Sequence, residues 1–173
     1  MIKKLALMFA IALLPLTSFA QFSLDTKGLE PFEKGKVFLG ASLTGIDLSY
    51  SGSSELNLGV DAQLGYMIFD NFMAFGTVGY KHSGLKGVHD QFSAGFGGRY
   101  YIVQNGLFLG ANCKFVHANK NYNDVMPGVE IGYSYFISRT VTIEPSIYYQ
   151  QSFKNHSDFS TVGLKIGLGI YLE

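Results

Sequence analysis

The sequence predicts an all-β fold: one domain built as an eight-stranded, antiparallel, up-and-down barrel. Three observations lead to this prediction. Alternation of apolar residues with a period of two continues through most of the chain after residue 35. Turns rich in Asn, Asp and Gly separate the alternating stretches. The 173 residues include 21 Gly, 15 Phe and 11 Tyr, but only 15% are charged and 47% are apolar, which excludes a disordered chain.

The N-terminus has the pattern of a signal peptide. Lys3 and Lys4 give it a positive start, and the apolar run Leu5–Leu14 follows. A run of this length is too short to span a bilayer, which needs about 20 residues. We expect cleavage near Ala20–Gln21 and export of the mature chain. The expected organisation is a signal peptide at 1–20, an irregular lead-in at 21–35 and the barrel at 36–173.

The strands follow from the alternation, which is clearest from Leu56 to Ile68, where every second residue is apolar. Pro127 and Pro145 each lack a backbone donor, so we expect a bulge or a strand end at both. Strands are expected at 36–50, 56–68, 73–83, 91–103, 107–120, 125–137, 141–154 and 160–172. Tight turns are expected at 69–72, 104–106 and 138–140, and longer polar connections at 51–55, 84–90, 121–124 and 155–159.

The composition of the two strand faces indicates which face points outward. The apolar face contains no charged residue, as a lipid-facing wall requires, because a charge at mid-bilayer costs about 2–4 kcal/mol there. The other face is rich in Gly, which weakens a solvated strand but makes room inside a narrow barrel. We therefore expect the apolar face to meet lipid; the alternative is a secreted soluble barrel that binds an apolar ligand. The inward glycines are Gly40, Gly59, Gly65, Gly79, Gly95, Gly97, Gly110, Gly128, Gly132, Gly163, Gly167 and Gly169.

Inside such a barrel, two groups of residues are predicted to fill the lumen. Aromatic side chains near the tight turns, taken as the periplasmic end, form a plug: Phe38, Phe75, Tyr101, Phe108, Phe136 and Tyr171. Met67 and Thr142 complete that ring. Charged residues above the plug should pair, because an unpaired buried charge is costly. This ion-pair network comprises Asp61, Lys81, Arg99, Lys114, Glu130, Glu144 and Lys165, with Arg99–Glu144 in a lower layer. A plugged lumen argues against a general diffusion pore; a narrow channel is the alternative.

Three hairpin segments carry a family resemblance: 65–71 (GYMIFDN), 95–101 (GFGGRYY) and 143–149 (IEPSIYY). With these the chain resembles the small eight-stranded outer-membrane barrels, such as OmpX and the transmembrane part of OmpA, and the outer-membrane β-barrel domain common in Bacteroidota. The resemblance implies residence in the outer membrane of a Gram-negative bacterium. It also implies insertion by the barrel-assembly machinery and contact with lipid and lipopolysaccharide.

The same resemblance implies a C-terminal assembly signal. Lys165, Gly167, Ile170 and Leu172 fit its spacing of a polar residue, a glycine and alternating hydrophobic residues. The chain departs from the family pattern at Leu172, where Phe is usual, and Glu173 follows it.

Little in the sequence indicates catalysis or a cofactor. Four histidines, His82, His89, His117 and His156, fall at the outer ends of strands, with Asp124 in the same polar rim, and are weak metal candidates without a fixed ligand spacing. Barrel enzymes that remove acyl chains from lipid A use a His-x-Ser pair, whereas here His82-Ser83 and His156-Ser157 are adjacent and would point to opposite faces. Zero net charge without a basic run argues against nucleic acid. We therefore expect no enzyme and no cofactor, but a structural or surface-interaction role.

Overall fold

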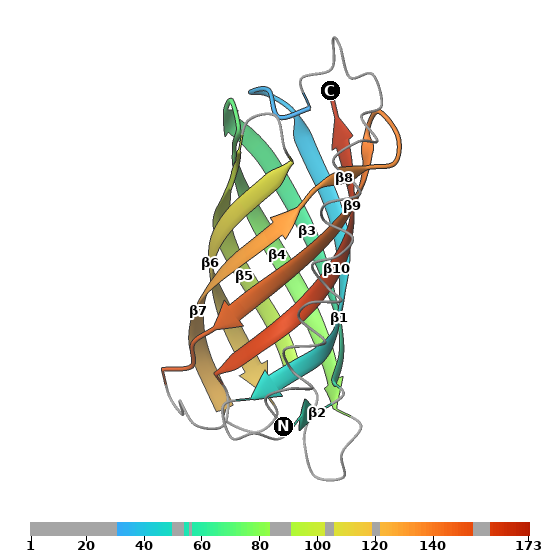
Figure 1. The fold of residues 1–173 in the computed structure, drawn as a ribbon. Helices are drawn as coiled ribbons and strands as arrows, with labels where there is room; N and C mark the ends of the chain where they lie inside the picture. The colour runs from blue at the N-terminus through green and yellow to red at the C-terminus, as the bar shows by residue number, and fades with distance from the viewer. Residues whose placement is uncertain are drawn as a thin grey trace. The chain divides into compact units, whose positions relative to one another are not determined.

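The computed structural model describes residues 31–49, 54–55, 57–83, 91–102, 106–118, 122–153 and 160–173. Residues 31–173 form one compact unit, and its strands curl into a closed barrel (Figure 1). The expected signal peptide and the lead-in up to residue 30 lie outside the described residues. No helix in the described part of the chain is long and apolar enough to cross a membrane.

Eight long strands form the wall, and two short strands accompany them. The elements are β1 (Val37–Ser49), β2 (Ser54–Glu55), β3 (Asn57–Phe69), β4 (Phe72–Ser83), β5 (Gln91–Tyr101), β6 (Leu107–Ala118), β7 (Tyr122–Tyr133), β8 (Tyr135–Phe136), β9 (Val141–Gln150) and β10 (Thr161–Leu172). β2 pairs only with β1, and β8 continues the line of β7 along β9.

Closure of the barrel comes from the first and last strands. β1 pairs with β3 on one side and with β10 on the other, and β10 also pairs with β9. All pairings are antiparallel and join strands that follow one another in the chain, apart from this closing seam. The prediction of an eight-stranded up-and-down barrel is therefore confirmed. In β1 the register to β10 shifts between Thr44 and Ile46, as an extra residue in one strand requires.

The strand expected at 125–137 differs most from the structure. It begins earlier, at Tyr122, and is interrupted at Ser134. The backbone N–H of Ser134 donates to the Gly106 carbonyl (2.7 Å), which continues the register of β6 with β7, and its hydroxyl donates to the Glu144 carboxylate (2.9 Å). The interruption lies on the β9 side, where Pro145 lacks a backbone donor. β9 is correspondingly shorter than expected and ends at Gln150.

Each of the two prolines interrupts pairing on one side only. The Pro127 carbonyl accepts from the Gln151 N–H (2.8 Å), so the donor-less nitrogen also faces β9, and pairing with β9 begins one residue later. Pro145 lies where pairing of β9 passes from β7 to β8. The opposite ladders, Pro127 to β6 and Pro145 to β10, continue unbroken. Both prolines thus lie inside strands, Pro127 in β7 and Pro145 in β9, so the expected bulge or strand end is wrong; each proline interrupts only the ladder between these two strands.

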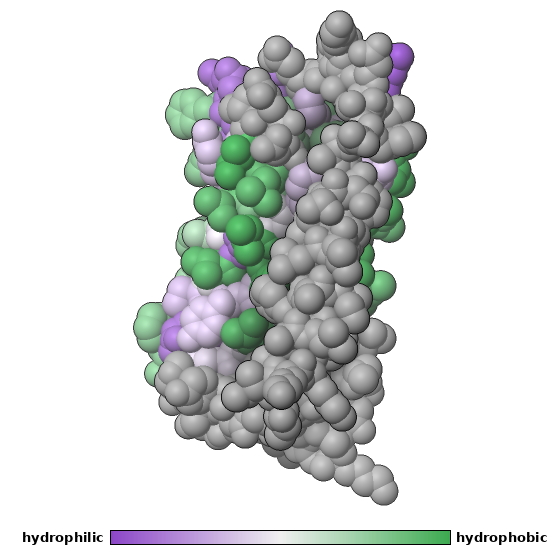
Figure 2. Space-filling model, in the orientation of Figure 1, coloured by the Kyte–Doolittle hydropathy of each residue, from purple (hydrophilic) through white to green (hydrophobic). Residues whose placement is uncertain are grey.

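The outer wall is apolar, as expected. Exposed hydrophobic side chains project from all eight long strands, for example Leu43, Leu64, Val78, Phe96, Leu109, Val129, Ile147 and Ile166. Figure 2 shows hydrophobic residues over much of the middle of the visible wall and hydrophilic residues near the top. The twelve glycines expected on the inner face are all buried or half-buried. The alternation therefore places the apolar residues on the outer face of the wall and the glycines on the inner face.

The two ends of the barrel differ. We call the end with the Asp70–Asn71 and Ser138–Thr140 turns the turn end, and the opposite end the loop end; the turn end is at the top of Figure 1. Asn71 turns the chain with a φ of 63°, in the left-handed region that Asn tolerates better than most residues. Both termini of the described barrel, β1 at its start and β10 at its end, lie at the turn end.

Candidate functional site

A cluster of aromatic side chains fills the lumen at the turn end. Phe38, Tyr101, Phe108 and Tyr171 are almost completely buried, and Phe75 is buried with them. Phe136 is half-buried and packs against this cluster. The structure thus brings together all six residues expected near the tight turns, together with Met67, which was expected in the same ring, and Met73, which was not. Thr142, expected in the same ring, is fully buried.

One further member of this cluster was missed by the sequence analysis. Phe32, in the lead-in, stacks on Tyr101 with ring centroids 4.1 Å apart and planes 15° apart. It also forms edge-to-face pairs with Phe136 and Tyr171, with ring centroids 5.8 and 5.6 Å apart. The only signal in the sequence is an aromatic residue just ahead of the first strand, followed by Gly35, whose φ of 97° suits a turn.

Arg99 lies next to the aromatic cluster, on the side of the loop end, and is the centre of the ion-pair network. Its guanidinium binds Glu144 at 2.8 Å and Glu130 at 2.8 Å. It also lies over the Phe108 ring, 4.0 Å from the centroid, at a distance suited to a cation–π contact. The flat, five-donor guanidinium can satisfy two carboxylates and an aromatic face at once, which a Lys ammonium cannot.

The network continues from Glu130 toward the loop end. Its second carboxylate oxygen accepts from the Lys165 ammonium. A separate pair, Lys114–Asp61, lies 3.2 Å apart. The sequence predicts Arg99–Glu144 in a lower layer, apart from the other pairs; in the structure, Glu130 joins that pair to Lys165 in one continuous chain. Lys81 is half-buried on β4.

Glycines make these pairings possible. In the register, Arg99 lies opposite Gly110, and Gly110 lies opposite Glu130. The ion pair therefore reaches across a strand at a residue without a side chain. The same arrangement recurs with Gly128, which lies between Asn112 and Gln150, whose amides are hydrogen-bonded at 2.8 Å. Inward glycines on the strand between them thus leave room for polar partners on two non-adjacent strands to reach each other.

Hydroxyl groups complete the coordination of Glu144. Ser134 donates to its carboxylate at 2.9 Å, and Thr142 and Tyr171 each donate at 3.1 Å. The Tyr171 hydroxyl also lies 2.9 Å from that of Tyr101. Such a buried carboxylate, with a charged partner and several donors, is well satisfied. Two inward atoms in the described residues have no hydrogen-bond partner, the Gln63 Nε2 and the Ser146 Oγ.

Side-chain exposure changes along the lumen. The Arg99 side chain is 1% exposed and that of Glu144 6%, whereas Lys165 is 16% exposed and Lys114 22%. The inward side chains are therefore almost completely buried around Arg99 and the aromatic cluster, and more exposed toward the loop end. We call this buried part the floor; it consists of the aromatic cluster with Phe32, and of Arg99, Glu144 and Glu130.

Asp124 is not the exposed rim residue that the sequence suggested. It is buried on β7, accepts a hydrogen bond from the Ser152 hydroxyl, and also accepts from the Val125 N–H at 2.8 Å. The backbone N–H of Ser152 donates to Ser160 at 3.1 Å. Because the strand begins earlier than expected, the alternation carries Asp124 onto the inner face.

The histidine candidates gain no support as a metal site. His117 is exposed, and its Nδ1 lies 2.6 Å from the Asn123 Oδ1. His89, His156 and the side chain of His82 lie outside the described residues. Within the described ranges, no three His, Cys, Asp or Glu side chains come together as metal ligands.

The proposed C-terminal signal residues all lie on β10. Lys165 and Gly167 face inward, and Ile170 and Leu172 face outward, so the alternation is regular through this strand. β10 pairs along β1 from Thr161 to Leu172.

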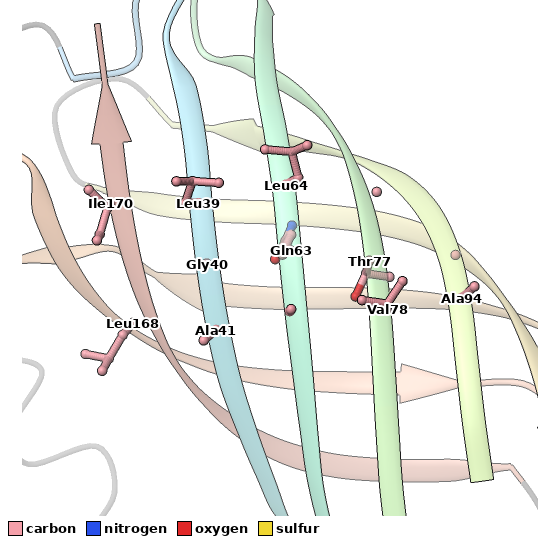
Figure 3. A pocket seen from close by; sticks show the side chains of 13 residues that line it. Leu39, Gly40, Ala41, Gln63, Leu64, Thr77, Val78, Ala94, Leu168 and Ile170 are labelled. Carbon is pink, nitrogen blue, oxygen red and sulfur yellow. The ribbon is translucent and has the colours of Figure 1, made fainter.

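A shallow apolar hollow lies in the outer wall over β10, β1, β3, β4 and β5. In Figure 3 Leu39, Leu64, Val78, Leu168 and Ile170 surround smaller outward residues. Ala41 and Ala62 are register partners at its centre. Its lining offers hydrocarbon almost throughout, so it suits an acyl chain and not a polar ligand.

Comparisons with known proteins give matches in structure only. No protein-family model matches the chain, and no curated protein matches it. The N-terminal β-barrel domain of OprF from Pseudomonas aeruginosa matches with a TM-score of 0.64 and 13% identity, over 80% of this chain and 98% of that one. Neisserial surface protein A (NspA) matches with a TM-score of 0.58 and 16% identity, over 79% and 97%. The Yersinia pestis outer-membrane protein Ail, in a nanodisc, matches with 0.54 and 11%, over 80% and 100%.

At identities this low, the matches support a shared fold alone. With the closed antiparallel wall and the apolar outer face, they show that residues 37–172 have the fold of the small eight-stranded outer-membrane β-barrels that the hairpins resemble.

Proposed function

We propose that this protein is an integral outer-membrane β-barrel with a structural or surface-interaction role, and that its plugged lumen makes it no general diffusion pore. The observation that carries the proposal is the combination of an apolar outer wall with a lumen occupied by ion pairs and aromatic side chains. In a soluble barrel that stores an apolar ligand, the distribution would be the reverse. No enzymatic activity is part of the proposal.

The height of the apolar wall supports a membrane crossing. On β5, Phe92 and Tyr100 are both exposed and point outward, eight residues apart. At a rise of about 3.3 Å per residue, they are separated by about 26 Å along the strand. With the usual strand tilt of about 40°, that gives an apolar band roughly 20 Å tall, close to what barrels of this kind present.

Aromatic residues also border this band. Near the turn end, Tyr66, Phe69 and Tyr100 are exposed, and near the loop end, Tyr80, Phe92 and Phe115. Aromatic girdles of this kind sit at the two interfaces of a bilayer. The proposed orientation places the turn end in the periplasm and the loop end outside, because outer-membrane barrels keep their short turns on the periplasmic side.

The closed floor is the basis for proposing that the protein does not conduct freely. Arg99, Tyr101, Phe108 and Met67 are almost inaccessible to solvent, so a solute entering from the loop end meets packed side chains. The proposed partners are bilayer lipid and lipopolysaccharide on the outer wall, and the barrel-assembly machinery during insertion through β10.

Membrane fractionation combined with gel mobility tests this proposal. The protein should be recovered with the outer membrane, float with vesicles, and shift in mobility when the sample is heated, as a folded barrel does. Recovery as a soluble periplasmic or secreted protein would refute it. Planar-bilayer recording tests the closed lumen: steady conductance in the unmodified protein would favour the narrow-channel alternative.

A further inference from the structure

The outward residues around the hollow in the outer wall follow the strand register in two rows. The row nearer the turn end consists of Ile170, Leu39, Leu64 and Gly76, and the row nearer the loop end consists of Leu168, Ala41, Ala62, Val78 and Ala94. In Figure 3 the first row lies above the second. Ala41, Ala62 and Gly76 lie on three neighbouring strands, and none of them has a side chain larger than a methyl group. These three residues therefore form the bottom of the hollow, and the larger side chains of both rows form its sides.

The hollow is long and narrow. Its second row crosses the strands β10, β1, β3, β4 and β5, and at a spacing of about 4.8 Å between neighbouring strands this gives a length of about 19 Å. The two rows are separated by two residues along each strand, or about 7 Å. The hollow has a volume of about 730 Å³, and pockets that hold small ligands measure about 300–1,000 Å³. Its shape and size suit one unbranched chain that lies across the strands.

The hollow lies between the two aromatic borders of the wall. Tyr66 belongs to the next row toward the turn end, and Tyr80 and Phe92 belong to the next row toward the loop end. The polar residues of the lining, Gln63 and Thr77, occupy inward-facing positions of β3 and β4. The outward side chains that line the hollow are therefore all apolar, and the hollow is continuous with the wall that is proposed to meet lipid. Hydrocarbon is the chemistry that such a hollow binds.

The two long sides of the hollow differ. On the loop-end side, the next row presents large exposed side chains: Leu43, Val60, Tyr80 and Phe92. On the turn-end side of Gly76, the next outward residue of β4 is Ala74, so small residues continue toward the turn end. A chain in the hollow is therefore least obstructed toward the turn end, which lies in the periplasm in the proposed orientation. Phospholipid forms the periplasmic leaflet of an outer membrane, whereas lipopolysaccharide lies in the outer leaflet.

We propose that this hollow is a fixed binding site for one acyl chain of a phospholipid from the periplasmic leaflet, with the headgroup at the turn end. The proposal rests on the proposed membrane-spanning barrel, and it adds a defined site to a wall that otherwise meets mobile lipid. An empty hollow leaves the atoms of its lining without partners on one side. A chain that lies in it gains contacts on its bottom and on both sides, which a flat wall does not offer.

Native mass spectrometry of the folded full-length protein tests the site. The protein is released from detergent micelles that contain phosphatidylethanolamine, at increasing collision energy. The unmodified protein should keep one phospholipid after all other lipids have been removed. Ala62→Phe fills the bottom of the hollow and should lower the retained fraction several-fold. Ala111→Phe, the same change at an exposed residue of β6 outside the hollow, is the matched control and should retain phospholipid as the unmodified protein does. Equal retention by Ala62→Phe and the unmodified protein would overturn the proposal.

Two further arms identify the occupant. Micelles that contain lipopolysaccharide in place of phosphatidylethanolamine should leave the unmodified protein without a retained lipid; selective retention of lipopolysaccharide would overturn the assignment to the periplasmic leaflet. The oligomeric state is read from the same spectra. If Ala62→Phe converts a dimer into a monomer without changing the bound phospholipid, the occupant is a second copy of the chain and the proposal is wrong.

Flotation with vesicles and heat-shifted gel mobility separate this proposal from the proposed function. If the unmodified protein does not float, the membrane-spanning barrel is wrong and the lipid site with it. If it floats and shifts normally but retains no phospholipid, the lipid site alone is wrong. Should Ala62→Phe fail to fold, Ala62→Leu, which adds a smaller side chain at the same position, decides the question by the same comparison with the unmodified protein.

Discussion

Gly110 lies directly opposite Glu130 in the register of β6 and β7, and a Cβ at position 110 would come 2.6 Å from the Glu130 Cγ. Because Arg99 binds the Glu130 carboxylate, this side chain cannot move away from an added Cβ without weakening the ion pair. The absence of a side chain at position 110 is therefore part of the ion-pair network.

The first prediction concerns this glycine. Gly110→Ala should destabilise the folded barrel by about 1–3 kcal/mol, as overpacking does in a closed interior. Urea titration, with the folded fraction read from unheated gel mobility, measures the change. Gly76→Ala is the matched control, since its nearest atom would be a backbone oxygen at 3.9 Å on the outer wall. Equal effects of the two substitutions would contradict the assignment.

The second prediction concerns Arg99. Arg99→Ala leaves Glu130 and Glu144 buried without their shared cation, and should cost about 3–5 kcal/mol, the loss typical of a broken buried ion pair. Arg99→Lys should recover only part of that, because an ammonium cannot hold two carboxylates and stack on Phe108. The midpoint of urea unfolding ranks the three proteins. The exposed Arg139→Ala serves as the control.

A third prediction compares two acidic residues of the lumen. Glu130 accepts from both Arg99 and Lys165 and is almost wholly buried, whereas Asp61 accepts from Lys114 in the more open part of the lumen. Because water screens the Asp61 pair, Glu130→Gln should lower the unfolding midpoint clearly more than Asp61→Asn. The reverse order would mean that the floor is not the more stabilising part of the network.

The fourth prediction tests the outer wall in lipid. Ile166→Lys, at a position 62% exposed in the middle of β10, should destabilise the barrel in vesicles by about 2–4 kcal/mol, whereas Val162→Lys, nearer the loop end, should cost about 0–1 kcal/mol. The unfolding free energies in vesicles, compared with those of the unmodified protein, give the depth dependence. Two equal costs would place the bilayer at a different height.

Most of the fold could be predicted because its signal is local. A period of two assigns each residue to one face, and the apolar face of β10 from Val162 to Leu172 is readable without any knowledge of its neighbours. The six aromatic residues of the plug follow from the same parity plus their proximity to the turns. Both kinds of information lie within single strands.

What could not be predicted depends on relations between strands. The contact of Arg99 with Glu130 requires knowing that Gly110 separates them in the register. The interruption at Ser134 lies opposite the part of β9 that contains Pro145, which lacks a backbone donor, while the local sequence continues the alternation. Phe32 lies in a segment with no period at all, so nothing in the pattern assigns it to the lumen.

The two prolines weaken one and the same boundary of the wall. Pro127 and Pro145 both remove backbone donors between β7 and β9, and this pair is joined only over Gly128–Gly132, with a short continuation through β8. By contrast, β1 and β10, which close the barrel, are paired along nearly their whole length. When strands of the wall separate, in a fluctuation or under applied force, we therefore expect β7 and β9 to separate first. The pairing of β1 with β10 should persist longest.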